Sequence, residues 1–303
     1  GRALRRSPQS EPSYLKGLMF ALDCPLLLSD RSLGNYDLLP GDAELLAALA
    51  RRPFPLVVLP TGSAYPPAPQ AAKLRKLGLA VRDECMLTPS SVAADLMVRA
   101  GVQRALVLGG AGVGQALRDA QIDTVQAGEH GEREVDAVYV GWYPECTMKA
   151  IEAACEAIWA GARFYVASDV PFFATQQGRT MGYSYAIVGA IRRVTRAPMS
   201  RTGKPSLHAL RFVARRLGLR RCDVGIVGDD PSVEILMARR GGARAFAVTT
   251  GVTSGEEWAR QIGLRRPDQV LRRLGDLLEC LAPLPGDVRE GATRCDLRDG
   301  VTR

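Results

Sequence analysis

The sequence predicts an α/β protein built on a parallel β-sheet, and three observations lead to that prediction. Short apolar runs that end in turn residues alternate with longer stretches of helical periodicity. This alternation is typical of parallel strands whose two faces are covered by helices. The chain has 303 residues and 47% hydrophobic content, so it is long enough for about two domains and apolar enough to bury a large core.

The predicted elements alternate along most of the chain. The apolar runs predicted as strands are 18–22, 56–59, 105–108, 137–140, 164–167, 224–227 and 245–249. The stretches predicted as helices are 42–51, 92–100, 148–160, 207–217 and 232–240. Residues 1–13 and 286–303 have mixed charges and few large apolar side chains, so we expect flexible tails there.

Composition excludes several classes of protein. The net charge of +8 is spread along the chain, and aromatic residues make up only 6% of it, so we expect no nucleic-acid partner. A small anion fits this charge balance well. No apolar run approaches the roughly 18 residues of a membrane span, and the first segment lacks the apolar centre of a secretory signal. We therefore expect a soluble, cytoplasmic protein without a membrane partner.

The cysteines and histidines give little sign of a metal or disulfide framework. Seven cysteines are an odd number and include no CxxC pair, which argues against both disulfide pairing and a zinc ribbon. Two histidines are too few for a multi-histidine metal site. We expect reduced thiols.

Ligands of parallel sheets bind beyond the carboxyl ends of the strands, so the residues after each apolar run are the first candidates. Lys204 lies in a Gly-Lys-Pro-Ser turn, whose proline suits a first helical turn and whose amides could face an anion. Asp229 and Asp230 follow a buried strand directly, where carboxylates suit a hard cation such as magnesium. Each feature has a simpler alternative: a solvated charge for Lys204, and helix caps for the two aspartates.

The order of these segments resembles the haloacid dehalogenase superfamily. An aspartate-bearing first strand, a hydroxyl-bearing turn at 60–63, a long insertion, the turn at 203–206 and Gly-Asp-Asp at 228–230 carry the resemblance. It extends to the subclass of NagD-like and p-nitrophenyl-phosphatase-like proteins. The resemblance implies a Rossmann-like core of residues 14–82 and 186–285 with an inserted α/β cap at 83–185.

The resemblance also implies roles for single residues. The family's nucleophilic aspartate aligns with Ala21, and its second aspartate, a general acid and base, aligns with Asp23. The family hydroxyl of the second motif aligns with Pro60, one residue before Thr61. The resemblance further implies phosphate binding by Thr61, Gly62 and Lys204, and weak metal binding by Asp229, Asp230 and Glu234. Asp169 of the cap would contact the substrate. Its alternative role is that of an aspartate in an ordinary turn.

These matches predict a protein that keeps a phosphate or anion pocket but lacks the attacking carboxylate. We expect it to bind a small phosphorylated or anionic metabolite without ordinary phosphatase activity. Magnesium is expected to bind weakly or only with the ligand. A homodimer through the cap is also expected, as in capped relatives.

Two alternatives remain open for the function. Asp23 could serve as acid and base in a divergent enzyme, either non-hydrolytic or a weak phosphatase, or as the nucleophile in a shifted register that would leave Pro25 as its partner. The chain could instead be a homodimeric scaffold.

Two further features of the predicted cap have competing interpretations. The glycine-rich run at 109–114 lacks the G-x-G-x-x-G spacing because Gln115 takes the last position, so a turn between strand and helix is favoured over a dinucleotide site. Four aromatic residues either line the cap or pack in its core: Trp142, Tyr143, Tyr183 and Tyr185.

Overall fold

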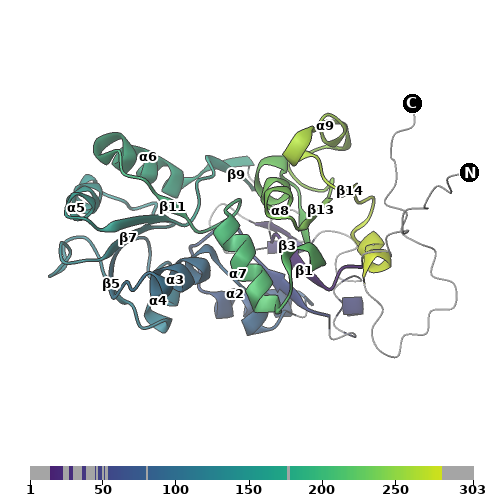
Figure 1. The fold of residues 1–303 in the computed structure, drawn as a ribbon, viewed down its shortest axis with the longest axis horizontal. Coiled ribbons are helices and arrows are strands. Elements are labelled where there is room, and N and C mark those ends of the chain that lie inside the picture. The colour runs from purple at the N-terminus through teal and green to yellow at the C-terminus, as the bar shows by residue number, and fades with distance from the viewer. Residues whose placement is uncertain are drawn as a thin grey trace, which may run out of the picture.

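The protein consists of two α/β lobes, each built around its own five-stranded sheet (Figure 1). The computed structural model describes residues 14–22, 27–29, 36–38, 45, 47–49, 51, 54–79, 81–175 and 178–281. Within them, no helix combines the length and the apolar character that crossing a membrane requires. The predicted tails at 1–13 and 286–303 lie outside these residues.

The first sheet is entirely parallel, as predicted. Its strands, in spatial order, are β14 (Gln269–Val270), β13 (Arg244–Ala247), β12 (Val224–Gly228), β1 (Gly17–Phe20) and β4 (Leu56–Val58). Leu18 and Phe20 of β1 pack into one apolar cluster and Met19 into another. Because successive side chains of a strand point to opposite faces, the sheet is buried on both sides.

The second sheet is also parallel and follows the same rule. Its strands, in spatial order, are β11 (Ser200–Arg201), β8 (Arg163–Val166), β7 (Ala137–Val140), β5 (Arg104–Leu108) and β6 (Asp123–Val125). Leu106 and Val138 pack on one face, and Ala105 and Tyr139 on the other. The division at residues 83 and 185 stays a prediction, but β11, which lies beyond it, pairs with this sheet.

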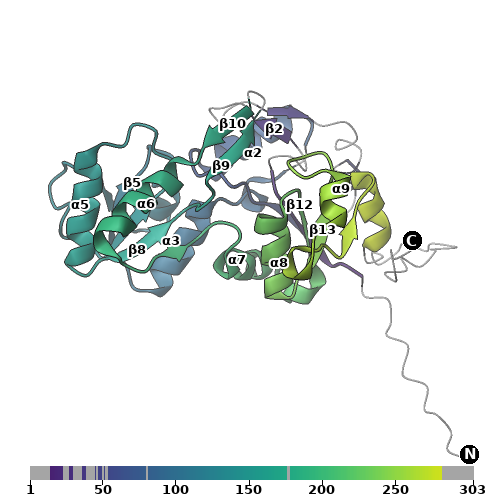
Figure 2. The same cartoon turned by 90° about the horizontal axis from the view of Figure 1, so that it is seen from above.

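Helices cover both sheets, and local capping fixes where several of them begin. Thr88 and Ser91 form a capping box at the start of α3, and Ser206 caps α7 by accepting a hydrogen bond from Ala209 N. The α-helices are α2 (Pro67–Lys76), α3 (Pro89–Arg99), α4 (Gln115–Asp119), α5 (Met148–Trp159), α6 (Tyr183–Thr195), α7 (Leu207–Leu217), α8 (Leu236–Gly241) and α9 (Gly255–Ala259). Figure 2 shows α5 and α6 on the second lobe, and α7 and α8 on the first.

All seven predicted strands are present, with ends shifted by at most two residues. The predicted helix at 232–240 begins with a π-helical turn, η3 (Pro231–Ile235), which continues into α8. Of the predicted helix at 42–51, Leu45 and residues 47–49 are helical and residue 51 lies in a turn, while the others lie outside the described part of the chain. The proline of the Gly-Lys-Pro-Ser turn was wrongly placed in a first helical turn, since α7 begins two residues later, after its cap Ser206.

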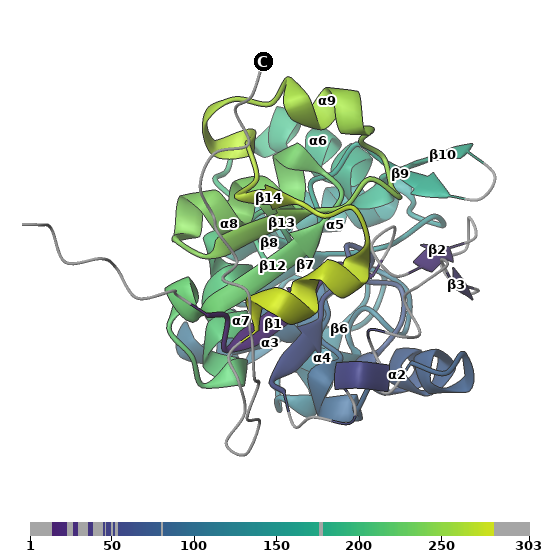
Figure 3. The ribbon, with the colours of Figure 1, turned by 90° about the vertical axis from the view of Figure 1, so that its right-hand side faces the viewer.

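Two small antiparallel hairpins were missed because none of their four strands consists of apolar residues alone. One is formed by β2 (Leu27–Ser29) and β3 (Tyr36–Leu38), the other by β9 (Phe172–Thr175) and β10 (Gly178–Met181). Figures 2 and 3 place both hairpins on the same side of the junction between the lobes.

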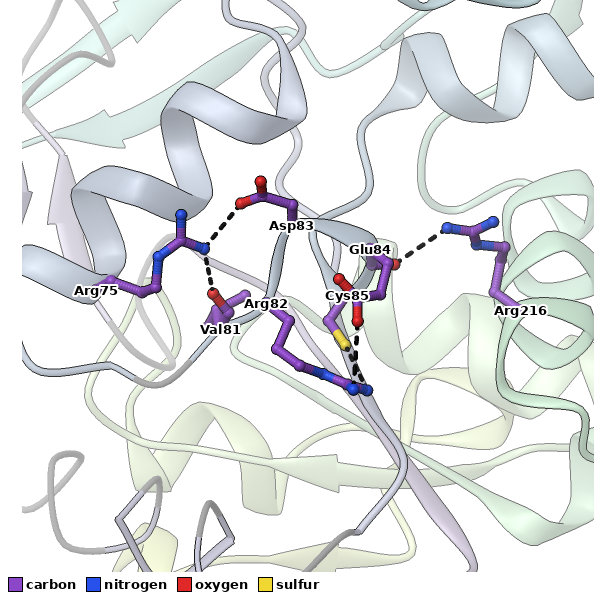
Figure 4. A network of polar contacts seen from close by, with 7 residues as sticks. All are labelled: Arg75, Val81, Arg82, Asp83, Glu84, Cys85 and Arg216. Atoms are coloured by element: carbon purple, nitrogen blue, oxygen red, sulfur yellow. Dashed lines mark hydrogen bonds and ion pairs between the residues drawn. The ribbon is translucent and has the colours of Figure 1, made fainter.

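The segment that leads from the first lobe into the second is tied down from two directions (Figure 4). Arg75 of α2 donates to Val81 O and to Asp83 Oδ1, each at 2.8 Å. From the other side, Arg216 of α7 donates to Glu84 O at 3.1 Å. Leu87 N then donates to Val58 O at 2.9 Å, so the chain extends the edge of the first sheet before it enters α3.

Candidate active site

A buried ion pair joins the carboxyl ends of the two sheets. Lys204 Nζ lies 2.7 Å from Glu234 Oε1, and the side chains are only 1% and 4% exposed. Lys204 follows β11 of the second sheet, where Thr202 N and Gly203 N continue the ladder by donating to residues at the end of β8. Glu234 lies in η3, directly after β12 of the first sheet. The two parts of the predicted site therefore meet.

Asp229 lies beside this pair in a buried position at the end of β12. Its Oδ2 accepts a hydrogen bond from Val252 N at 2.9 Å. A Cβ atom on Gly251 would lie 2.1 Å from the same oxygen, so only glycine allows this loop to approach the carboxylate. Burial, and next the neighbouring Glu234, raise the pKa of Asp229 to about 7.

Asp230 serves as a cap for the turn that follows. Its Oδ1 accepts from Ser232 N at 2.7 Å, which is the simpler role that the sequence left open for this pair of aspartates. Its own backbone N–H donates to Glu234 Oε2 at 3.3 Å. Burial, followed by Glu234, raises the pKa of the Asp230 carboxyl. The capping bond directs this carboxylate to the backbone of its own turn.

Ala21 stands at the end of β1, next to the strand that carries Asp229. Its backbone N–H donates to Val227 O at 3.0 Å, and its side chain is buried. The site therefore has a methyl group at the end of this strand. Asp23, the predicted acid and base, lies outside the described residues.

The loop after β4 places Thr61 and Gly62 at the same edge of the first sheet. Both are half-buried, and Leu59 N donates to Phe20 O at 2.9 Å, so the loop starts beside β1. Ser63, which sequence reasoning did not single out, is buried, and its Oγ accepts from Trp142 N of the second lobe at 3.0 Å. The predicted phosphate loop is thus in contact with the second lobe.

Asp169, the predicted substrate contact from the cap, is engaged by an arginine. Arg201 of β11 donates through Nη2 to Asp169 Oδ2, and the side chains are 32% and 19% exposed. Arg201 was missed because a two-residue strand leaves no periodic signal in the sequence. The ion pair holds the loop after β8 close to the segment that carries Lys204.

Two segments of the chain match family models. Residues 33–123 match the family model described as haloacid dehalogenase-like hydrolase, and residues 201–277 match the model described as HAD-hydrolase-like. The chain belongs to the haloacid dehalogenase-like superfamily. Its two matched segments contain the loop at 61–62 and the residues Lys204, Asp229 and Glu234, respectively.

Relatives of this haloacid dehalogenase-like chain are named as phosphatases of small metabolites. The acid sugar phosphatase of Staphylococcus haemolyticus is 26% identical over 243 residues, which cover 80% of this chain and 88% of that protein. The dihydroxyacetone phosphatase of Corynebacterium glutamicum is 23% identical over 247 residues, or 80% of this chain and 86% of the other.

Solved structures share the same fold. The p-nitrophenyl phosphatase from Archaeoglobus fulgidus superimposes with a TM-score of 0.77 at 24% identity, covering 88% of this chain and all of the other. The glycerol phosphate phosphatase from Mycobacterium tuberculosis, determined in complex with magnesium, gives 0.75 at 24% identity, with 90% of this chain and 80% of the other covered. NagD from E. coli K-12 gives 0.75 at 21% identity, with 87% of this chain and 98% of the other covered.

The three predicted magnesium ligands each have a partner within the protein. Glu234 is paired with Lys204, and Asp229 and Asp230 each accept a backbone hydrogen bond. Among the described residues, no group of three or more Asp, Glu, His or Cys side chains is arranged to hold a metal ion. The predicted ligand set of Asp229, Asp230 and Glu234 stays a prediction.

Proposed function

We propose that this haloacid dehalogenase-like protein binds a small phosphorylated metabolite between its two lobes and lacks ordinary phosphohydrolase activity. The observation that carries the proposal is the buried methyl group of Ala21 at the end of β1, beside β12, the strand that leads to Asp229 and Glu234. Covalent phosphoryl transfer in this family needs a carboxylate oxygen at that point, and an alanine has neither charge nor lone pair.

Binding of the anion is supported by the buried cation and the loop beside it. Lys204 is shielded from solvent, so its attraction for a phosphate group is only weakly screened. Glu234 balances its charge, and we expect the backbone N–H groups of Thr61 and Gly62 to provide further hydrogen bonds. The phosphatase names of the relatives favour a phosphate ester of a small metabolite over other anions.

Magnesium binding, in this proposal, depends on the ligand. The cation prefers oxygen ligands and is commonly bound by one or two carboxylates together with phosphate oxygens. Asp229 would supply such a carboxylate, and the phosphate group of the ligand would complete the site. We therefore expect weak magnesium binding in the absence of a phosphorylated ligand.

The quaternary structure and cellular location remain parts of the proposal. Met148 and Trp159 of α5 and Val194 of α6 are exposed apolar side chains on two helices that pack together, which favours a homodimer through the cap. A cytoplasmic location agrees with the thiol form of Cys85, Cys146, Cys155 and Cys222. The alternative use of Asp23 as acid and base gains no support from the described residues.

The test combines binding and turnover. Ligands that bind only the folded state raise its melting temperature, so a panel of phosphorylated metabolites is screened by thermal shift with and without magnesium. We expect a shift with at least one phosphate ester, and no hydrolysis of p-nitrophenyl phosphate above the level of an Asp229→Asn variant. Hydrolysis at ordinary rates that Asp229→Asn abolishes would refute the proposal.

A further inference from the structure

An aromatic residue at the carboxyl edge of the second sheet contacts one of the two segments that are expected to hold phosphate. Trp142 follows β7, and Lys204 follows β11 on the same edge. Trp142 N donates to Ser63 Oγ, two residues after Thr61. The tryptophan is therefore attached to the loop that is expected to hold phosphate.

Tyr183 packs against this tryptophan from a different element. The ring centroids are 4.8 Å apart and the ring planes meet at 88°, an edge-to-face arrangement that aromatic rings favour. Both side chains are half-buried, so part of the pair stays open to solvent. Tyr183 belongs to none of the four apolar clusters of the described residues, whereas Trp142 borders the one that contains Tyr139. A pure core role therefore does not account for the pair.

The backbone around Tyr183 is fixed before any ligand arrives. Ser184 Oγ donates to Ser168 O at 2.9 Å, which ties the first turn of α6 to the loop after β8. A Cβ atom on Gly182 would lie 2.0 Å from Val170 O, so the chain passes very close to that loop just before the tyrosine. A pre-ordered wall loses little conformational entropy when a ligand binds it.

We propose that Trp142 and Tyr183 form an aromatic wall beside the phosphate pocket and select phosphate esters whose organic group is a planar ring. This inference rests on the proposed function, because it assumes that Lys204 and the loop at 61–62 hold the phosphate group. A planar ring can stack on exposed indole or phenol surface, whereas a saturated group of equal size gains only from burial.

The test uses three probes that cannot be hydrolysed at the C–P bond: phenylphosphonate, cyclohexylphosphonate and propylphosphonate. Affinities for the full chain are measured by calorimetry, with inorganic phosphate as the common reference. Phenyl and cyclohexyl groups are both apolar and similar in size, so their comparison isolates stacking from burial. We expect phenylphosphonate to bind about fivefold more tightly than cyclohexylphosphonate.

Variants then assign this preference to the wall. Trp142→Leu should bring the ratio of the two affinities to about one, while Trp142→Phe should keep the preference. Tyr185→Leu is the matched control, since Tyr185 lies two residues after Tyr183 on α6 and is exposed. The melting temperature of each variant verifies folding.

The outcomes separate this inference from the proposed function. Equal affinities for the phenyl and cyclohexyl probes, or a preference that survives in Trp142→Leu, would overturn the aromatic wall while the phosphate pocket stands. Failure of all three phosphonates and of inorganic phosphate to bind would overturn both.

Discussion

Lys204 and Glu234 form an ion pair at 2.7 Å although they belong to segments that leave different sheets. Both side chains are almost fully buried, so each charge relies on the other for its solvation. The pair therefore connects the two lobes at the point where their strands end. The free energy of this ion pair therefore contributes to the stability of the candidate site.

Replacing Lys204 with methionine should strongly destabilise the protein. The substitution leaves Glu234 buried without its cation, and breaking a buried pair on one side typically costs about 3–5 kcal/mol. Urea unfolding followed by circular dichroism measures this loss of unfolding free energy. Arg82→Met removes a solvent-exposed pair with Glu84 and should leave stability unchanged within error.

A double variant checks that the loss comes from the unpaired charge. Lys204→Met combined with Glu234→Leu removes both charges and should be more stable than Lys204→Met alone. If the double variant is the less stable of the two, the carboxylate was not the cause of the loss.

Restoring the missing carboxylate should create phosphatase activity. Ala21→Asp combined with Pro60→Thr places a carboxylate and a hydroxyl at the positions that we propose correspond to the family's nucleophile and second-motif hydroxyl. We expect at least trace hydrolysis of p-nitrophenyl phosphate in the presence of magnesium, measured by release of nitrophenolate. Because Ala21 is buried, the melting temperature of the variant is measured alongside its activity.

The matched control is Ala21→Asn with Pro60→Thr, which has nearly the same shape but a much poorer nucleophile. Activity in the aspartate variant and its absence in the asparagine variant would assign the chemistry to the new carboxylate. A folded but inert aspartate variant would indicate that the pocket no longer admits the substrate.

The regular part of this fold could be predicted from the sequence because strand and helix periodicities are local. Met19 alternates with Leu18 and Phe20 between the two faces of β1, a pattern that neighbouring residues alone define. The presence of Lys204 and Asp229 in one site could be expected from their places after apolar runs, and from an order of motifs that resembles a known family.

The remaining contacts of the site join residues far apart in the chain, so no local pattern in the sequence predicts them. Ser63 and Trp142 are 79 residues apart in the sequence, and their hydrogen bond depends on how the lobes dock. Arg201 lies 32 residues from Asp169 and belongs to a strand of only two residues. Side-chain partners such as these are fixed by tertiary packing, which periodicity does not report.

Stability should fall between acidic and neutral pH because of Asp229. Its folded-state pKa of about 7 lies above its ordinary value of 3.8, so the folded protein keeps a proton that the unfolded chain releases in this window. The contribution is present in full below about pH 4 and is lost as the pH rises through about 7. We expect a decrease in unfolding free energy of roughly 2–4 kcal/mol, measured by urea unfolding at several pH values.

Asp229→Asn should flatten this pH profile, since an amide does not titrate. Asp119→Asn, on the exposed surface of α4, serves as the control and should keep the slope of the wild-type protein. Parallel profiles for the wild-type and Asp229→Asn proteins would rule out this carboxyl as the source.

The docking of the lobes should depend on Gly112 but not on its neighbour Gly110. A Cβ atom on Gly112 would lie 2.3 Å from Ala64 O, in the loop that follows Thr61, whereas a Cβ atom on Gly110 meets nothing within 4 Å. Gly112→Ala must therefore push the glycine-rich turn away from the predicted phosphate loop, at a cost of about 1–3 kcal/mol. Hydrogen exchange of the amides at 61–65 should accelerate in Gly112→Ala and stay unchanged in Gly110→Ala. If the two variants have the same exchange rates and the same unfolding free energy, the glycine-rich turn accommodates the added Cβ atom without loss of stability. The second lobe then does not pack against this loop in solution.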